Sequence, residues 1–202
     1  AAEHKAYGYD FPSARERVEQ LEETLQIVKA MWTESKATFN GKHYQITDAY
    51  CDPKPNPIPP IMVGAFGPKM LRLTAKFADE WNVSSTGLIE YRRLVDEFER
   101  ICADANRDPS TVRRSWCGGC VCAPTQADVE RFAGTRYSAD NPDENFDLIG
   151  TPQQVIEQMQ SFIEMGVDSF MVDCGGFPNL TTLEMLVNEV LPVLAKRNST
   201  RF

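Results

Sequence analysis

The chain has 202 residues, of which 42% are hydrophobic and 25% are charged, as in an ordinary globular protein. This composition excludes a disordered chain, a collagen-like fibre and a small disulfide scaffold. The formal net charge of -8 argues against nucleic acid as a partner, because an acidic surface repels a phosphate backbone. No apolar run approaches the roughly 18 residues of a membrane-spanning helix, so no membrane partner is expected.

The first residues, Ala1 to Lys5, contain no Met and no apolar core of a secretion signal. The six cysteines are too sparse for a disulfide framework, which favours reduced thiols. We therefore expect a cytoplasmic protein.

The first 60 residues predict one helix and one hairpin. A helix is expected from about Ser13 to Met31, because Ser13 is a good N-cap and Glu16 follows three residues later. The run from Phe39 to Lys42 contains Asn-Gly and predicts a hairpin turn. Closely spaced prolines then favour an extended, helix-free backbone as far as residue 60.

From residue 61 onwards, short apolar runs alternate with helical patterns. Strands are predicted at 61–63, 80–84, 112–122 and 169–173. Helices are predicted at 68–77, 89–105, after the N-cap Thr125, at 151–165 and at 181–194, whereas 136–147 is polar and irregular. Such alternation indicates parallel β/α units, and four are visible. Four parallel strands suggest half of an eight-stranded barrel, with a small open α/β sheet as the alternative.

The turn from Gly64 to Pro68 is the most informative for function. A strand ends there, two glycines flank a short loop, and a helix starts at Pro68. The free N–H groups at a helix start, together with the helix dipole, suit a phosphate, and glycines let an anion approach the backbone. Tight strand-to-helix turns also use glycine for structural reasons alone, so this alternative stays open.

The run from Pro60 to Asn82 (PIMVGAFGPKMLRLTAKFADEWN) resembles the second half of the luciferase-like monooxygenase superfamily, most closely the branch that uses coenzyme F420. Further stretches resemble that family in the same order, and the resemblance covers nearly the whole chain: 3–8, 11–12, 39–44, 51–55, 150–152 and 166–168.

The resemblance implies an α/β fold, the (β/α)8 TIM barrel, with this chain as a single domain over residues 1–202 that covers strands five to eight. It also implies coenzyme F420 as cofactor, with FMN as the alternative. The missing first half would hold the family's proton-transferring residues, so no catalytic residue is assigned. Carried over position by position, the cofactor-binding residues would be Gly64, Ala65, Phe66, Gly67, Trp81, Asn82 and His4. Trp81 as a core aromatic and His4 as a solvated side chain remain open.

Other motifs favour structural roles. The run from Trp116 to Cys120 resembles a thioredoxin motif, but it lies in a predicted strand, where no helix start stabilises a thiolate. A zinc site would need a second cysteine pair, so no metal is expected. The acidic residues Asp140, Asp143, Glu144 and Asp147 lack the spacing of a calcium loop and are expected to be solvated.

The expected function is hydride transfer between coenzyme F420 and a small organic substrate. The alternatives are an FMN-dependent monooxygenase, a non-catalytic half-barrel that binds or assembles, and a thiol redox protein. The outermost strands, near Met62 and Met171, should be unpaired edges with an apolar inner face on view. We therefore expect either a homodimer or a missing N-terminal half to cover them.

Overall fold

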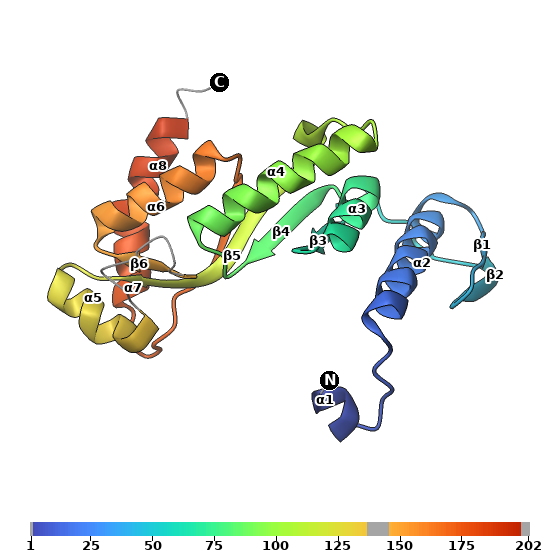
Figure 1. Ribbon diagram of the computed structural model, residues 1–202, viewed down its shortest axis with the longest axis horizontal. Helices are drawn as coiled ribbons and strands as arrows, with labels where there is room; N and C mark the ends of the chain where they lie inside the picture. The colour runs from blue at the N-terminus through green and yellow to red at the C-terminus, as the bar shows by residue number, and fades with distance from the viewer. Residues whose placement is uncertain (1, 137–145, 199–202) are drawn as a thin grey trace. The chain divides into compact units, whose positions relative to one another are not determined.

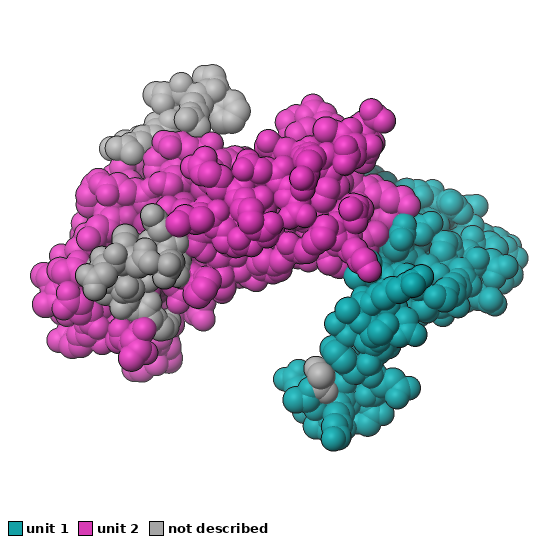
Figure 2. Space-filling view, in the orientation of Figure 1, with its two compact units in different colours: residues 1–61 teal, residues 62–202 magenta. Residues whose placement is uncertain are grey.

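The computed structural model describes residues 2–136 and 146–198. The chain divides into two compact units, residues 1–61 and 62–202, which Figure 2 distinguishes by colour. The division falls directly after the proline-rich segment. None of the helices in the described ranges has the length and apolar character that crossing a bilayer requires. The single domain over residues 1–202 stays a prediction.

The first unit contains two helices and a hairpin: α1 (Ala2–Ala6), α2 (Ala14–Thr33), β1 (Ala37–Asn40) and β2 (Gln45–Ala49). The predicted start of α2 is confirmed. The Ser13 hydroxyl accepts a hydrogen bond from the Glu16 amide at 3.3 Å, and the Glu16 carboxylate accepts one from the Ser13 amide at 2.9 Å. The predicted hairpin is also confirmed, because β1 and β2 pair antiparallel around the Asn-Gly turn.

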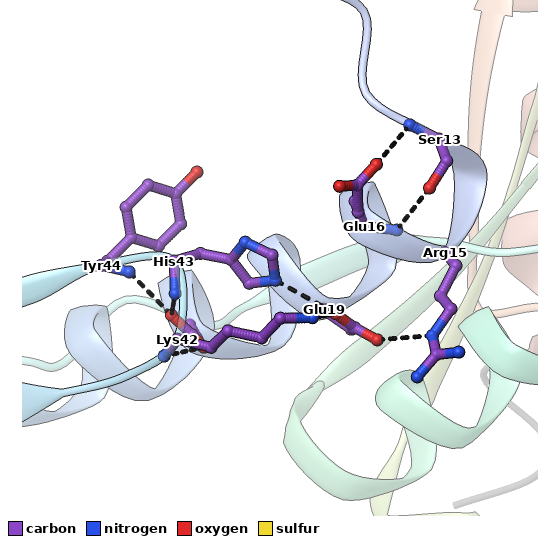
Figure 3. Close-up of polar contacts among 8 residues, drawn as sticks. Ser13, Arg15, Glu16, Glu19, Lys42, His43 and Tyr44 are labelled. Atoms are coloured by element: carbon purple, nitrogen blue, oxygen red, sulfur yellow. Dashed lines mark hydrogen bonds and ion pairs between the residues drawn. The ribbon is translucent and has the colours of Figure 1, made fainter.

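Two carboxylates of α2 hold this hairpin turn. The Glu23 carboxylate accepts hydrogen bonds from the backbone amides of Lys42, His43 and Tyr44, at 2.8 to 2.9 Å. The Glu19 carboxylate accepts a hydrogen bond from Lys42 Nζ at 2.7 Å and lies 3.1 Å from the His43 ring (Figure 3). These bonds span about twenty residues, so the turn conformation depends on the helix as well as on local turn chemistry.

The second unit follows the predicted alternation of strands and helices (Figure 1). Its strands are β3 (Met62–Gly64), β4 (Glu80–Ser84), β5 (Arg113–Cys122), β6 (Leu148–Gly150) and β7 (Ser169–Asp173). Its helices are α3 (Pro68–Phe77), α4 (Leu88–Asp104), α5 (Gln126–Ala133), α6 (Pro152–Glu164), α7 (Thr181–Met185) and α8 (Leu191–Asn198), with 3₁₀ turns at Pro109–Thr111 and Gly134–Arg136. The single helix predicted at 181–194 is interrupted by a π-helical turn, Leu186–Val190.

The sheet is parallel, with β4 between β3 and β5, and β5 also pairing with β6 and β7. One strand was not predicted: β6 has three residues and pairs with the second half of β5. Among the described residues, β3 pairs only with β4, and β7 pairs only with β5. The prediction that these two strands are sheet edges is confirmed for this part of the chain.

One face of the sheet, the outer face, carries the core and is covered by helices. Side chains alternate along a strand, so Trp81 and Val83 of β4 share this face, and both are fully buried. Trp81 packs against Phe98 of α4 with ring centroids 4.6 Å apart, and Trp116 of β5 packs against Phe162 of α6 at 5.5 Å. The helices α4 and α6 therefore fix this face of the sheet.

The opposite face, called the inner face below, has a different chemistry. In β3, β4, β7 and residues 113–119 of β5, the register places these residues on it: Met62, Gly64, Glu80, Asn82, Ser84, Arg113, Ser115, Cys117, Gly119, Ser169, Met171 and Asp173. Apart from Met62 and Met171, these side chains are small, polar or charged. The predicted apolar inner face is therefore wrong for β3, β4, β7 and residues 113–119 of β5, because Trp81, Val83 and Trp116 pack against the helices on the outer face. Beyond this part of the sheet, Val121 of β5 and Ile149 of β6 are apolar and buried.

Candidate functional site

The loop from Gly64 to Gly67 joins β3 to α3 at the carboxyl end of the sheet. Two hydrogen bonds from β4 fix it. The Ala65 amide donates to the Asn82 carbonyl at 3.2 Å, and Trp81 Nε1 donates to the Ala65 carbonyl at 3.0 Å. Ala65 itself is buried, whereas the Phe66 side chain is 45% exposed. The loop is thus anchored at its second residue and open beyond it.

The two glycines of this loop border open space. A Cβ atom built on Gly64 or Gly67 would meet no other atom of the described residues within 4 Å, and neither residue has a positive φ. Neither backbone strain nor packing among the described residues therefore requires glycine here. Glycine also leaves room for another molecule to approach the backbone closely. This observation favours the functional interpretation of the glycines over the structural one.

The start of α3 presents unpaired donors to the same space. Gly67 is the N-cap and makes no side-chain capping bond, and Pro68 occupies the first helical turn. Among the described residues, no group accepts a hydrogen bond from the amides of Phe66 or Gly67. A helix start of this kind carries a partial positive charge and suits an anionic group such as a phosphate. No acidic residue lies in the first turn of α3 to oppose an anion.

Trp81 and Asn82 contribute to the loop in different ways. Trp81 is fully buried on the outer face, as the core alternative holds, and it reaches the loop only through its indole N–H. Asn82 is half-buried on the inner face, where its Nδ2 donates to Ser115 Oγ at 2.9 Å. Ser115 is not among the predicted site residues. Side chains alternate along β5, so Ser115 lies on the other face of the sheet from Trp116. No local sequence pattern gives the register that brings Ser115 next to Asn82.

His4 lies in the first unit, on α1. Its ring packs edge-on against Phe11 with centroids 4.9 Å apart, and the side chain is exposed. Phe11 in turn lies 4.1 Å from the Arg17 guanidinium. His4 therefore takes part in an aromatic contact within its own unit, and its assignment to the cofactor stays a prediction.

The cysteines of β5 lie inside a strand and not at a helix start. Burial raises the pKa of the Cys120 thiol, and it raises that of Cys122 to about 12. Gly118 and Gly119 are small because the Trp116 ring and the Asp147 carboxylate fill the space that a Cβ would need. The Trp-Cys-x-x-Cys run thus reflects packing around β5.

Of the acidic residues expected to be solvated, Asp140, Asp143 and Glu144 lie outside the described residues. Asp147 is half-buried, and its carboxylate accepts a hydrogen bond from the Gly119 amide at 3.0 Å. It is therefore a structural partner of β5, which contradicts the solvated interpretation for this residue. In the described ranges, no group of three His, Cys, Asp or Glu side chains is placed to hold a metal ion.

Comparison with known proteins agrees with this geometry. Residues 1–145 match the model of a family described as luciferase-like monooxygenase. The F420-dependent glucose-6-phosphate dehydrogenase of Intrasporangium calvum is 24% identical over 217 residues, which cover 94% of this chain and 65% of that protein. The chain thus spans 65% of the length of this curated relative.

Two solved structures share the fold. An F420-dependent secondary alcohol dehydrogenase, in complex with an F420-acetone adduct, gives a TM-score of 0.68 at 18% identity over 81% of this chain and 58% of that one. The EDTA monooxygenase of Chelativorans sp. BNC1 gives a TM-score of 0.74 at 17% identity over 96% of this chain and 62% of that one. The predicted fold class, a partial (β/α)8 barrel, is confirmed.

Proposed function

Since the chain belongs to the luciferase-like monooxygenase family, we propose that it forms the cofactor-binding part of a coenzyme F420-dependent oxidoreductase. The observation that carries the proposal is the open glycine loop at residues 64–67, which lies at the carboxyl end of a parallel sheet. Active sites of (β/α)8 barrels form at that edge. The relative from Intrasporangium calvum is named for its dependence on F420, which favours this cofactor.

The residues of the loop fit the phosphate of such a cofactor. Gly64 and Gly67 leave room beside the backbone, and the amides of Phe66 and Gly67 lack acceptors among the described residues. The buried indole of Trp81 holds the Ala65 carbonyl, so the loop keeps its shape without a ligand. A preformed anion site loses less conformational freedom on binding than a mobile loop.

Coenzyme F420, when bound, supplies a deazaflavin ring that exchanges a hydride with a small organic substrate. This chain contributes phosphate binding at the loop and a polar inner face below it. No residue of the chain is proposed to transfer a proton. The family resemblance assigns that task to residues in the first half of the barrel, which would also help to exclude water.

The alternative cofactor is FMN, which the resemblance to the luciferase-like monooxygenase family also allows. F420 and FMN both carry a phosphate on a ribityl chain, so the glycine loop alone does not separate them. The full-length protein should be titrated with each cofactor and binding followed by fluorescence. Tighter binding of F420 is expected. Binding of FMN alone would favour the monooxygenase, and binding of neither would overturn the proposal.

A second measurement separates catalysis from cofactor binding alone. Reduction of F420 by candidate alcohols and sugar phosphates should bleach the visible absorption of the deazaflavin in the presence of the full-length protein. Binding of F420 with no turnover on any substrate would favour the non-catalytic half-barrel.

The open edges of β3 and β7 bear on assembly. We propose that further strands cover them, supplied either by the first half of the barrel or by a second copy of the chain. Unpaired strand edges invite pairing with another chain. Sedimentation velocity of the 202-residue chain at micromolar concentration should therefore show a dimer or aggregate. A monodisperse monomer with cooperative unfolding would contradict this proposal.

A further inference from the structure

One row of residues crosses four of the five strands of the sheet on its inner face. Gly64 of β3, Asn82 of β4, Ser115 of β5 and Ser169 of β7 occupy the same level on successive strands. Ser115 is fully buried and Asn82 is half-buried. The row therefore joins a glycine with open space above it to a fixed polar pair.

The Asn82–Ser115 contact sets the orientation of the amide. Asn82 Nδ2 lies 2.9 Å from Ser115 Oγ and 3.5 Å from the Ser115 carbonyl oxygen. A carbonyl oxygen can only accept, so the end of the amide that faces Ser115 is the NH₂ group. The other end, Oδ1, points away from Ser115, and no group among the described residues donates to it. Asn82 thus presents a hydrogen-bond acceptor with a defined direction.

This acceptor lies beside the phosphate loop. Asn82 pairs with Gly64 in the register, and its carbonyl accepts the hydrogen bond from the Ala65 amide. Adjacent strands are about 4.8 Å apart. A ligand whose phosphate contacts residues 64–67 and whose next atoms run over the inner face therefore passes close to Asn82. Gly64 has no side chain to keep them away.

We propose that Asn82, oriented by Ser115, accepts a hydrogen bond from a hydroxyl group of the ribityl chain of the bound cofactor. In F420 and in FMN, the segment next to the phosphate is a ribityl chain, whose hydroxyls are hydrogen-bond donors. The acceptor end of Asn82 matches that chemistry for either cofactor. Ser115 is a positioning residue, because it acts only through Asn82. The inference rests on the proposed function, since it needs the phosphate at the glycine loop.

The test measures the preference for hydroxyls on the linker. The full-length protein is titrated with its cofactor and with a phosphorylated analogue whose linker is an unsubstituted alkyl chain. Asn82→Ala should weaken binding of the cofactor by about threefold to tenfold, the usual effect of one hydrogen bond, and leave binding of the analogue nearly unchanged. Ser115→Ala should also weaken binding of the cofactor and not of the analogue. The double variant should bind the cofactor no more weakly than Asn82→Ala alone.

Ser169→Ala is the matched control, since it lies in the same row two strands from Asn82 and should leave the hydroxyl preference unchanged. Equal loss for cofactor and analogue in Asn82→Ala, or no loss in either, would overturn the inference. If thermal unfolding shows that Asn82→Ala does not fold, the Ser115→Ala variant tests the inference. An unchanged hydroxyl preference in Ser115→Ala would refute the role of Asn82. Failure of the unsubstituted protein to bind any cofactor would instead refute the proposed function.

Discussion

Trp81→Phe tests whether a buried indole shapes the phosphate loop. The substitution keeps an aromatic ring against Phe98 but removes the hydrogen bond to the Ala65 carbonyl. The lost hydrogen bond costs about 1 kcal/mol, and the smaller ring in a fully buried site costs about 1–2 kcal/mol more. The free energy of unfolding should therefore fall by about 2–3 kcal/mol, which corresponds to a drop in Tm of about 5–10 °C.

The same change should weaken cofactor binding. Without the indole, Ala65 is held on one side only, by the hydrogen bond that its amide donates to the Asn82 carbonyl. The ligand must then order the loop as it binds, and we expect its affinity to fall by about threefold to tenfold. Urea unfolding measures the first effect and fluorescence titration of the cofactor measures the second.

The chain offers a close control in Trp116. It is 1% exposed, and its indole N–H donates to the Thr86 carbonyl at 3.0 Å, in the loop after β4. Trp116→Phe should lower stability by a similar amount and leave cofactor affinity within twofold of the parent. If both variants weaken cofactor binding equally, the loss reflects general destabilisation and the role assigned to Trp81 is refuted. Unchanged affinity in Trp81→Phe refutes it as well.

Three further predictions concern other parts of the chain. Gly67→Asp should weaken cofactor binding at least tenfold, because the new side chain adds negative charge and bulk at the phosphate loop. Gly134→Asp, in a turn 67 residues later, should not weaken it. Equal cofactor affinities of the two variants would refute the assignment of the phosphate to this loop. Cys117 and Cys120 should react slowly with thiol reagents at neutral pH, because both lie in a strand and burial raises the pKa of Cys120; rapid labelling at about pH 6 would revive the redox alternative. Hydrogen bonds from Lys42, Arg15 and His43 lower the pKa of Glu19 from 4.5 to about 2, so its support of the hairpin is complete above pH 4.5 and is lost as the pH falls toward 2. NMR shifts of the Lys42 side chain and the His43 ring, which contact Glu19, should follow that loss. Glu19→Gln should abolish this pH dependence, whereas the hairpin amides, which donate to Glu23, should keep theirs.

Local chemistry predicts most of the secondary structure. The capping box at Ser13 and Glu16 and the proline at the start of α3 each place a helix start to within a residue. β4 was predicted with its observed bounds, because Trp81 and Val83 alternate with polar residues in a five-residue run that follows the end of a helix. β6 was missed because three residues are too few to show a period, and their pairing with β5 is set far away in sequence.

The candidate site divides in the same way. The glycine loop was predictable, since its strand, glycines and proline are contiguous. The Asn82–Ser115 pair was not, because 33 residues separate its members and only the register of β4 on β5 brings them together. The polar inner face was missed for a related reason. Alternation shows that two faces differ, but it does not show which of them the helices cover.

The bonds that close the phosphate loop also set an order of assembly during synthesis. The indole of Trp81 reaches Ala65 across 16 residues, and the carbonyl of Asn82 comes one position later. A nascent chain that has emerged only as far as α3 carries all the loop residues but none of the groups that hold them. The loop therefore takes its final shape only after β4 has left the ribosome, and a nascent chain that ends in α3 should bind an anion more weakly than the finished sheet does.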